Sequence, residues 1–429
     1  MRDLFRALPT PAPDYSGVSA VFYGLDSIIV FHEPGGCTGG PAIYDETRML
    51  PCPKKVFSTN LREIDVITGG DDLYIRGIVN TARIVGGDCL CLIPSPVPML
   101  IGTDMEGIAK IIERETKIPT LTCGAFGMKD YDVGVEAAYL ALIDKFAGRY
   151  PGRGAAVNVL GAHEIDLWQP AMRRELDRII RSAGYDSVAF WGVDGGLEPI
   201  KGCPDAKINI AVSRAAIKPA RRLRQLFGTP YVVGYPVGAV MEERFRRLIQ
   251  NVGGALADAG EAQLGSGGAP LGAGEAADAG GALLAPPGAG KNERGGPKAL
   301  IITEQAQGNM LRHFLREELG FGPVRVMTFF GMEETLKEAG DSKILAEDDL
   351  ADLIKAGGPN DLNCCDPILK PFFEPLFADS PARFFPLPHI AISSRLFLGR
   401  GGGVLVGKEA SGRLKEDLTP DASRRAKLI

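Results

Sequence analysis

Short apolar runs alternate with longer segments of helical periodicity along this chain, and no other feature constrains its fold as strongly. Residues 84–93 (IVGGDCLCLI) and 119–123 (PTLTC) are short and apolar, which predicts buried strands. Residues 103–116 and 132–147 carry the period of an amphipathic helix. Strands that alternate with helices of this length form parallel sheets covered by helices.

The predicted helix 103–116 begins with a capping box, because Thr103 is followed three residues later by Glu106. The strand–helix alternation then restarts at AAVNVLG (155–161) and again at KALIIT (298–303). We therefore expect an α/β chain of three Rossmann-like, doubly wound parallel-sheet domains with ligand clefts between them.

The expected domain limits follow from where the alternation breaks. Residues 253–297 include 26 Gly or Ala among 45 residues and no aromatic residue, so we interpret them as a flexible linker or insertion. The expected units are a first α/β domain that carries a cysteine loop, a second α/β domain, the linker, a third α/β domain and a polar tail. Their boundaries are 1–150, 151–252, 253–297, 298–400 and 401–429.

Charge and cysteine usage narrow the classes of partner. The net charge of −5 disfavours nucleic-acid binding, and the sequence contains no apolar run long enough to cross a membrane. The first residues show no secretory leader, so we expect a cytoplasmic protein. In that reducing compartment the eight cysteines are expected to be buried thiols, reactive groups or metal ligands rather than disulfides.

One cysteine stands in an unusual setting, the loop FHEPGGCTGG (31–40). Gly35, Gly36 and two further glycines surround Cys37, and glycine lets backbone approach a bulky inorganic group closely. Thiolates are the preferred ligands of iron–sulfur clusters. The loop therefore fits a cluster site, although a tight turn with an incidental thiol would use the same residues.

Three successive segments strengthen the first interpretation. FHEPGGC (31–37), VFSTNLREIDVITGGDDLY (56–74) and IPSPVPMLIGTDMEGI (93–108) resemble, in this order, signatures of the nitrogenase component 1 family. The resemblance implies a three-domain α/β subunit and a cluster cysteine at Cys37. It also implies an ATP-dependent iron–sulfur reductase of the P-loop type as electron donor.

The sequence also departs from the family pattern. It keeps Cys37 but lacks the other cysteines that hold the family's eight-iron cluster, so a [4Fe-4S] cluster shared by two chains is the expected cofactor. Cys52 is the first choice for the second ligand, because it lies nearest to a vacated position. The vacated positions hold Tyr15 or Ser16, Val56 and Pro96.

A second site is implied nearer the end of the chain. The family's active-site metallocluster takes a histidine at a position similar to His389 and a cysteine where this chain has Val212. His389 is therefore a candidate cofactor-binding residue, while Val212 disfavours an iron–molybdenum cofactor. Either histidine, His32 or His389, could instead be a structural hydrogen-bonding group. Arg214 could contact substrate or form a salt bridge.

The expected function is a nitrogenase-like oxidoreductase component. It would take electrons from the reductase through a cluster at the interface of a homodimer, or of a heterodimer with a related subunit. It would pass them to a small-molecule substrate other than dinitrogen. A cofactor-assembly scaffold and a non-redox partner subunit are the alternatives. No role is assigned to the other cysteines considered, which are Cys89, Cys91, Cys203, Cys364 and Cys365.

Overall fold

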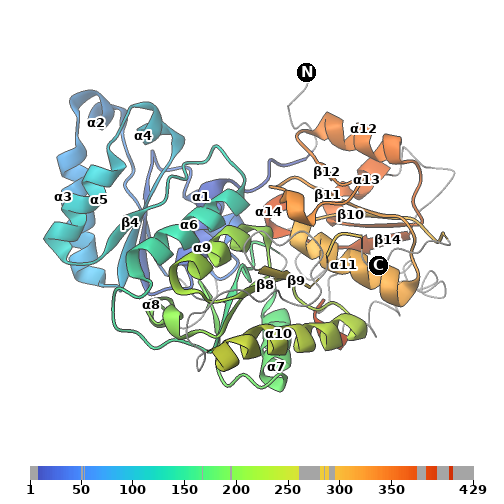
Figure 1. The fold of residues 1–429 in the computed structure, drawn as a ribbon. Coiled ribbons are helices and arrows are strands. Elements are labelled where there is room, and N and C mark those ends of the chain that lie inside the picture. Colours follow the sequence, from blue (N-terminus) through green and yellow to red (C-terminus); the bar gives the residue numbers. More distant parts are fainter. Residues whose placement is uncertain are drawn as a thin grey trace.

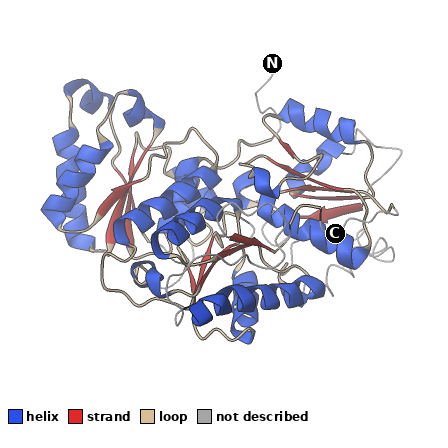
Figure 2. Cartoon of the chain, viewed as in Figure 1, coloured by secondary structure: helices blue, strands red, loops and turns tan. Residues whose placement is uncertain are grey.

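The computed structural model describes residues 8–49, 52, 54–166, 168–193, 196–259, 281–284, 286–288, 295–373, 383–393 and 405–408. These residues form three parallel sheets, each built from one segment of the chain (Figure 1). Figure 2 shows the three sheets separated by helices. The α/β fold of three parallel-sheet domains is thus confirmed.

The first sheet has the strand order β2-β1-β3-β4. Its two central strands, β1 (Ser27–His32) and β3 (Cys89–Pro94), are buried along their whole length because helices cover both faces. The outer strands are β2 (Lys55–Ser58) and β4 (Thr120–Thr122). The helices of this domain are α1 (Asp14–Phe22), α2 (Glu63–Thr68), α3 (Asp71–Val85), α4 (Pro96–Leu100), α5 (Met105–Thr116) and α6 (Tyr131–Phe146).

Alternation along β1 and β3 sends side chains to two different cores. Ile28, Val30, Leu90 and Leu92 pack with residues of α3 and α5, whereas the residues between them join the cluster that includes α1 and α6. Figure 1 shows the two helix pairs on opposite sides of this sheet.

The start of α5 differs from the expected one. The helix begins at Met105, and its N-cap is Asp104, whose carboxylate accepts a hydrogen bond from the Gly107 amide at 2.9 Å. An aspartate can cap as well as a threonine, and it lies one residue nearer to the first helical turn.

The second sheet has the order β6-β5-β7-β8-β9, and the third has the order β12-β11-β10-β13-β14. The second contains β5 (Val157–Leu160), β6 (Val188–Phe190), β7 (Ile208–Ala211), β8 (Tyr231–Val233) and β9 (Gly281–Leu283), with helices α7 (Pro170–Ser182), α8 (Glu198–Lys201), α9 (Ile217–Phe227) and α10 (Ala239–Ala259). The third contains β10 (Ala299–Ile302), β11 (Val324–Thr328), β12 (Ser342–Lys343), β13 (Leu362–Cys365) and β14 (Arg383–Pro386), with helices α11 (Gln305–Leu319), α12 (Glu347–Gly357), α13 (Lys370–Phe373) and α14 (Ile390–Ser393).

Described residues of the segment interpreted as a linker form parts of two secondary-structure elements. Helix α10 continues to Ala259, and β9 adds an edge strand to the second sheet by pairing with β8. Gly281 is required there, because a Cβ atom would come within 2.2 Å of the Tyr231 ring. Residues 260–280, 285 and 289–294, which make up most of this segment, lie outside the described residues.

The three domains share an apolar core. One cluster of buried side chains includes Phe31 of the first sheet, Leu160 of the second and Ile302 of the third. Burial of apolar area is the dominant stabilising term in folding. The three domains are therefore packed together rather than joined only by the chain.

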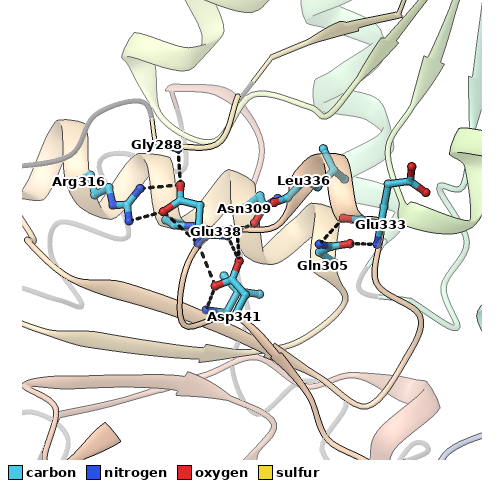
Figure 3. Close-up of polar contacts among 10 residues, drawn as sticks. Gly288, Gln305, Asn309, Arg316, Glu333, Leu336, Glu338 and Asp341 are labelled. Carbon is cyan, nitrogen blue, oxygen red and sulfur yellow. Dashed lines mark hydrogen bonds and ion pairs between the residues drawn. The ribbon is translucent and has the colours of Figure 1, made fainter. Parts of the chain in front are cut away.

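A buried polar network holds the loop that follows β11 against α11 (Figure 3). Arg312, with a side chain 1 % exposed, donates to both carboxylate oxygens of Asp341 at 3.0 and 2.8 Å. Arg316 forms a similar two-pronged pair with Glu338, at 2.9 and 2.8 Å. The Gly288 amide also donates to Glu338, at 2.7 Å, so the network reaches the end of the segment after β9.

Loss of the Arg312 guanidinium should be costly, because it leaves the carboxylate of Asp341 buried without its cation. We expect Arg312→Met to lower the free energy of unfolding by about 3–5 kcal/mol. Urea denaturation would measure the loss.

Arg247→Met is the matched control. Arg247 pairs with Glu243 at 2.8 Å, but the two side chains are 73 % and 48 % exposed. An exposed pair contributes about 0–1 kcal/mol. Equal losses in the two variants would contradict the importance of the buried network.

Candidate functional site

The loop that carries Cys37 leaves the carboxyl end of β1 and is organised around one buried carboxylate. Glu33 is fully buried, and its Oε2 accepts hydrogen bonds from the amides of Gly35 and Cys37 at 2.6 and 2.9 Å. Its Oε1 accepts from the hydroxyls of Thr38 and Ser58 at 2.6 and 2.5 Å. The loop is therefore wrapped around Glu33, and Cys37 is half-buried at its surface.

These contacts set the charge state around the thiol. Burial alone would raise the pKa of Glu33, but the hydrogen bonds from Ser58, Thr38 and the loop amides outweigh burial and lower it. Burial and the neighbouring Glu33 charge raise the pKa of Cys37, and the Ser95 hydroxyl acts in the opposite direction. Without a metal ion, Cys37 therefore keeps its proton. A bound metal ion would replace that proton and stabilise the thiolate.

Glycine is needed in this loop for two separate reasons. Gly35 has a φ of +101°, and a Cβ atom there would lie 2.8 Å from the Asn60 side-chain oxygen. At Gly36 and Gly39 a Cβ atom would meet nothing within 4 Å, so one side of the loop is open. This open side can accept a bulky inorganic group beside Cys37.

The structure anchors Cys37 and Cys52 at different ends of α1. Burial and then the nearby Cys37 raise the pKa of Tyr15, which lies in the first turn of α1. The carbonyl of Cys52 accepts a hydrogen bond of 2.5 Å from the hydroxyl of Tyr23, which follows the last turn. Eight residues of α-helix rise roughly 12 Å. Cys52 is exposed, but these contacts do not bring it beside Cys37 within one chain.

The remaining cysteines and His32 have structural surroundings. Cys89 and Cys91 point to the same face of β3 and are buried in the same apolar cluster as Cys123. The other three cysteines outside the loop segment are also buried: Cys203, Cys364 and Cys365. The His32 ring is buried, with Nδ1 3.0 Å from the Thr59 hydroxyl. Among the described residues, no group of three His, Cys, Asp or Glu side chains is arranged to hold a metal ion.

A second polar centre lies where the carboxyl ends of the three sheets meet. Asp132, at the start of α6, accepts hydrogen bonds from Arg214 of the second domain at 2.8 Å and from the Gly331 amide of the third at 3.0 Å. The Arg214 amide in turn donates to Glu304, the N-cap of α11, at 2.7 Å. Arg214 thus forms a largely buried ion pair between domains.

The same centre contains Tyr131, Asp166 and His389. The Tyr131 hydroxyl donates to Asp166, and His389 Nε2 lies 3.6 Å from the same carboxylate. The His389 ring packs against Tyr131 and Phe330, with ring centroids 5.8 and 5.2 Å away. Both ring nitrogens of His389 and the second oxygen of Asp166 have no hydrogen-bond partner among the described residues.

Burial dominates the proton affinities at this centre. It raises the pKa of Asp166 to about 8, with Asp132 acting in the same direction and Tyr131 opposing. Burial and Asp166 together raise the pKa of Glu304 to about 7. Burial lowers the pKa of His389 to about 4, so this imidazole is neutral at pH 7.

The position where the family's metallocluster takes a cysteine offers no open space in this structure. Val212 is fully buried in the core of the second domain, and its amide donates to the Leu160 carbonyl at 3.0 Å. A nearby cavity, lined by residues that include Tyr235, Thr303 and Gln307, has a volume of about 10 Å³, which is the size of one water molecule. In this conformation the centre is filled by its own side chains.

Reasoning from sequence missed Glu33, Asp132, Asp166 and Glu304. Three of them carried a usable signal, because each follows a short apolar run that forms a strand: Glu33 follows β1, Asp166 follows β5 and Glu304 follows β10. In α/β sheets such positions lie at the ligand-binding edge. Their burial could not be read from the sequence, because it depends on how the domains meet.

Three parallel-sheet domains with polar side chains gathered at their carboxyl ends, and a glycine-rich cysteine loop on the first, define a class of three-domain α/β proteins that bind ligands at sheet edges. The family described as nitrogenase component 1 type oxidoreductases matches residues 14–361. The chain belongs to this family.

Individual relatives are distant. The chain is 24 % identical over 197 residues to a nitrogenase molybdenum–iron protein alpha chain of Methanosarcina barkeri, covering 44 % of this chain and 36 % of the relative. It is 23 % identical over 254 residues to the nitrogenase iron–molybdenum cofactor biosynthesis protein NifE of a Nostoc species, covering 54 % and 49 %. The matches thus span between about a third and a half of these curated relatives.

The fold similarity is more extensive. A solved structure described as nitrogenase Cp1 at pH 6.5 superposes with a TM-score of 0.68 and 15 % identity, covering 99 % of this chain and 95 % of that one. None of the helices in the described ranges is both long and apolar enough to span a bilayer.

The buried carboxyl of Asp166 should make stability depend on pH. The pKa of Asp166 is higher in the folded state than in the unfolded state, so the folded state binds the extra proton. The contribution of Asp166 to the unfolding free energy is therefore fully present below about pH 4 and is lost as pH rises toward 8. Asp166→Asn keeps an acceptor for Tyr131 but does not titrate. We therefore expect its unfolding free energy, measured in urea from pH 5 to 8.5, to fall less steeply than that of the wild type.

Asp72→Asn, at an exposed position in α3, is the control and should keep the wild-type slope. If the unfolding free energy of Asp166→Asn changed with pH as steeply as that of the wild type, the raised pKa of Asp166 would be contradicted.

Proposed function

We propose that this protein is a nitrogenase-like oxidoreductase component. Electrons from an ATP-dependent iron–sulfur reductase of the P-loop type enter through a [4Fe-4S] cluster at a subunit interface. They pass to a small molecule, other than dinitrogen, bound where the three domains meet. The observation that carries this proposal is the open, glycine-rich loop that presents Cys37 at the carboxyl edge of the first sheet.

The residues around Cys37 fit such a cluster. When bound, it would supply a one-electron carrier. Cys37 would bind iron, and the open side of Gly36 and Gly39 leaves space for the inorganic core. Cys52 is proposed as the second ligand of each chain, since it is exposed and can be shared across an interface.

An exposed apolar surface around the loop supports a paired subunit. Ser95, which precedes α4, acts on Cys37, and Asn60, which precedes α2, lies against Gly35. We call the exposed apolar residues that follow the strand ends of the first domain the carboxyl-edge surface. They are Ile43, Tyr44, Ile64, Ile67, Leu73, Val97, Met99, Leu100, Ile101 and Met128. Exposed apolar side chains in the segments that follow one edge of a sheet support the proposal that this edge faces another subunit.

The centre between the domains is the proposed substrate site. Three carboxyl groups (Asp132, Asp166 and Glu304) and a valine at position 212 do not fit a metal–sulfur cofactor, which needs thiolate ligands. His389 can instead hydrogen-bond a bound molecule, because neither ring nitrogen has a hydrogen-bond partner within the described part of the chain. Since side chains fill the centre, entry of substrate would require the domains to part.

A cofactor-assembly scaffold is the second candidate. Three of the matched relatives are described as NifE cofactor biosynthesis proteins, at 23–25 % identity. A scaffold holds its cluster in transit and releases it to an acceptor protein. An electron-transfer component retains its cluster through repeated reduction and oxidation.

Iron and sulfide analysis of anaerobically purified protein tests the cluster. Cys37→Ser should abolish the iron content and the visible absorbance that dithionite bleaches, because the cluster loses a ligand from each chain. Cys364→Ser is the matched control, since this thiol is buried in β13 and should leave both unchanged. Cys52→Ser should resemble Cys37→Ser if Cys52 is the second ligand. Full iron content in both Cys37→Ser and Cys364→Ser would refute the site.

Substitution of the carboxyl-edge surface tests the subunit interface. Leu100 is 85 % exposed in α4, and Leu100→Asp should convert a dimer to a monomer in light scattering by placing a charge in an apolar interface. Ile84→Asp is the control, because Ile84 is 84 % exposed but lies at the last turn of α3, near the opposite edge of the sheet. A Leu100→Asp variant that stayed dimeric would place the interface elsewhere.

A further inference from the structure

Glu33 differs from the other buried carboxyl groups at the strand ends. Each of its oxygens accepts two hydrogen bonds, and all four donors come from the loop or from the end of β2: Gly35, Cys37, Thr38 and Ser58. None of these donors carries a positive charge. A carboxylate can be buried in this way when several hydrogen bonds replace its hydration.

This geometry favours the ionised form. Oε2 faces two amide N–H groups, which cannot accept a proton, and the two hydroxyls donate to Oε1. Glu33 therefore places a full negative charge directly beside the cysteine loop. It also directs the amides of Gly35 and Cys37 inward, where they cannot donate to sulfur atoms bound outside the loop.

We propose that Glu33 is the positioning residue of the Cys37 loop and that it holds the reduction potential of the bound cluster low. The inference rests on the proposed cluster at Cys37. Hydrogen bonds to cluster sulfurs and the charge around a cluster set its potential. A nearby anion disfavours the added electron, and amides held by Glu33 are withdrawn from the sulfurs. Both effects favour a strongly reducing cluster.

The positioning role can be measured without any metal. Hydrogen exchange of the Gly35 and Cys37 amides in the metal-free protein reports whether Glu33 holds them. Glu33→Gln removes the negative charge that strengthens these hydrogen bonds, so the two amides should exchange roughly 10–100-fold faster, while exchange in β1 and β3 stays unchanged. Glu63→Gln removes the same charge from an exposed position at the start of α2 and should exchange like the wild type.

The tuning role is measured on the iron-loaded protein by redox titration. Glu33→Gln should shift the midpoint potential in the positive direction, and Glu63→Gln should not, because water screens its charge. Glu33→Asp is the second variant, for use where Glu33→Gln does not fold. It keeps the charge but shortens the side chain, so the amides should exchange faster while the potential rises by less.

The outcomes separate this inference from the proposed function. Wild-type protein that binds no iron would overturn the proposed cluster and the tuning role together. Slow amide exchange in both Glu33 variants would overturn the positioning role, whether or not iron binds. An unchanged or more negative potential in iron-loaded Glu33→Gln would overturn the tuning role alone.

Discussion

The arrangement of the three domains depends on one carboxylate at their junction. Asp132 of the first domain accepts hydrogen bonds from Arg214 of the second and from the Gly331 amide of the third. It is 1 % exposed, so its interactions are not weakened by solvent. This contact fixes the start of α6 between the other two sheets, which brings Tyr131, Asp166 and His389 together. The side chains of the proposed substrate site come together because Asp132 joins the three domains.

The secondary structure was largely predictable from the sequence, and the reason is local. The predicted strand at KALIIT corresponds to Ala299–Ile302, and the predicted helix 132–147 to Tyr131–Phe146. These elements were found because the apolar period of a strand or a helix is written in a few consecutive residues. The N-cap of α5 was missed by one residue, since Thr103 and Asp104 are both good capping residues and only the structure distinguishes them.

The candidate site was less predictable, because its chemistry arises from residues far apart in the chain. Cys37 stood out through the glycines around it, and His389 through its resemblance to a family position. The contact between Tyr131 and Asp166, and the burial of Glu304, depend on how separate sheets pack. Glu33 lies within the quoted motif, but nothing in the letters HEPGGC indicates that its carboxylate turns inward to accept the loop's own amides.

The two centres are connected through the chain itself. The segment after the cysteine loop contacts the second domain, where Thr47 donates to Glu164 and Arg48 donates to the Gly192 carbonyl. Glu164 lies two residues before Asp166, within the same turn after β5. The Cys37 loop and the junction are thus joined by a short segment that is hydrogen-bonded to the second domain. The two buried acids, Glu33 and Asp166, differ in what sets their pKa: hydrogen bonds outweigh burial and lower the pKa of Glu33, whereas burial outweighs the Tyr131 hydrogen bond and raises the pKa of Asp166 to about 8. Under the proposed function, electrons would enter beside the Glu33 carboxylate, and Asp166 would hold a proton at the junction of the three domains.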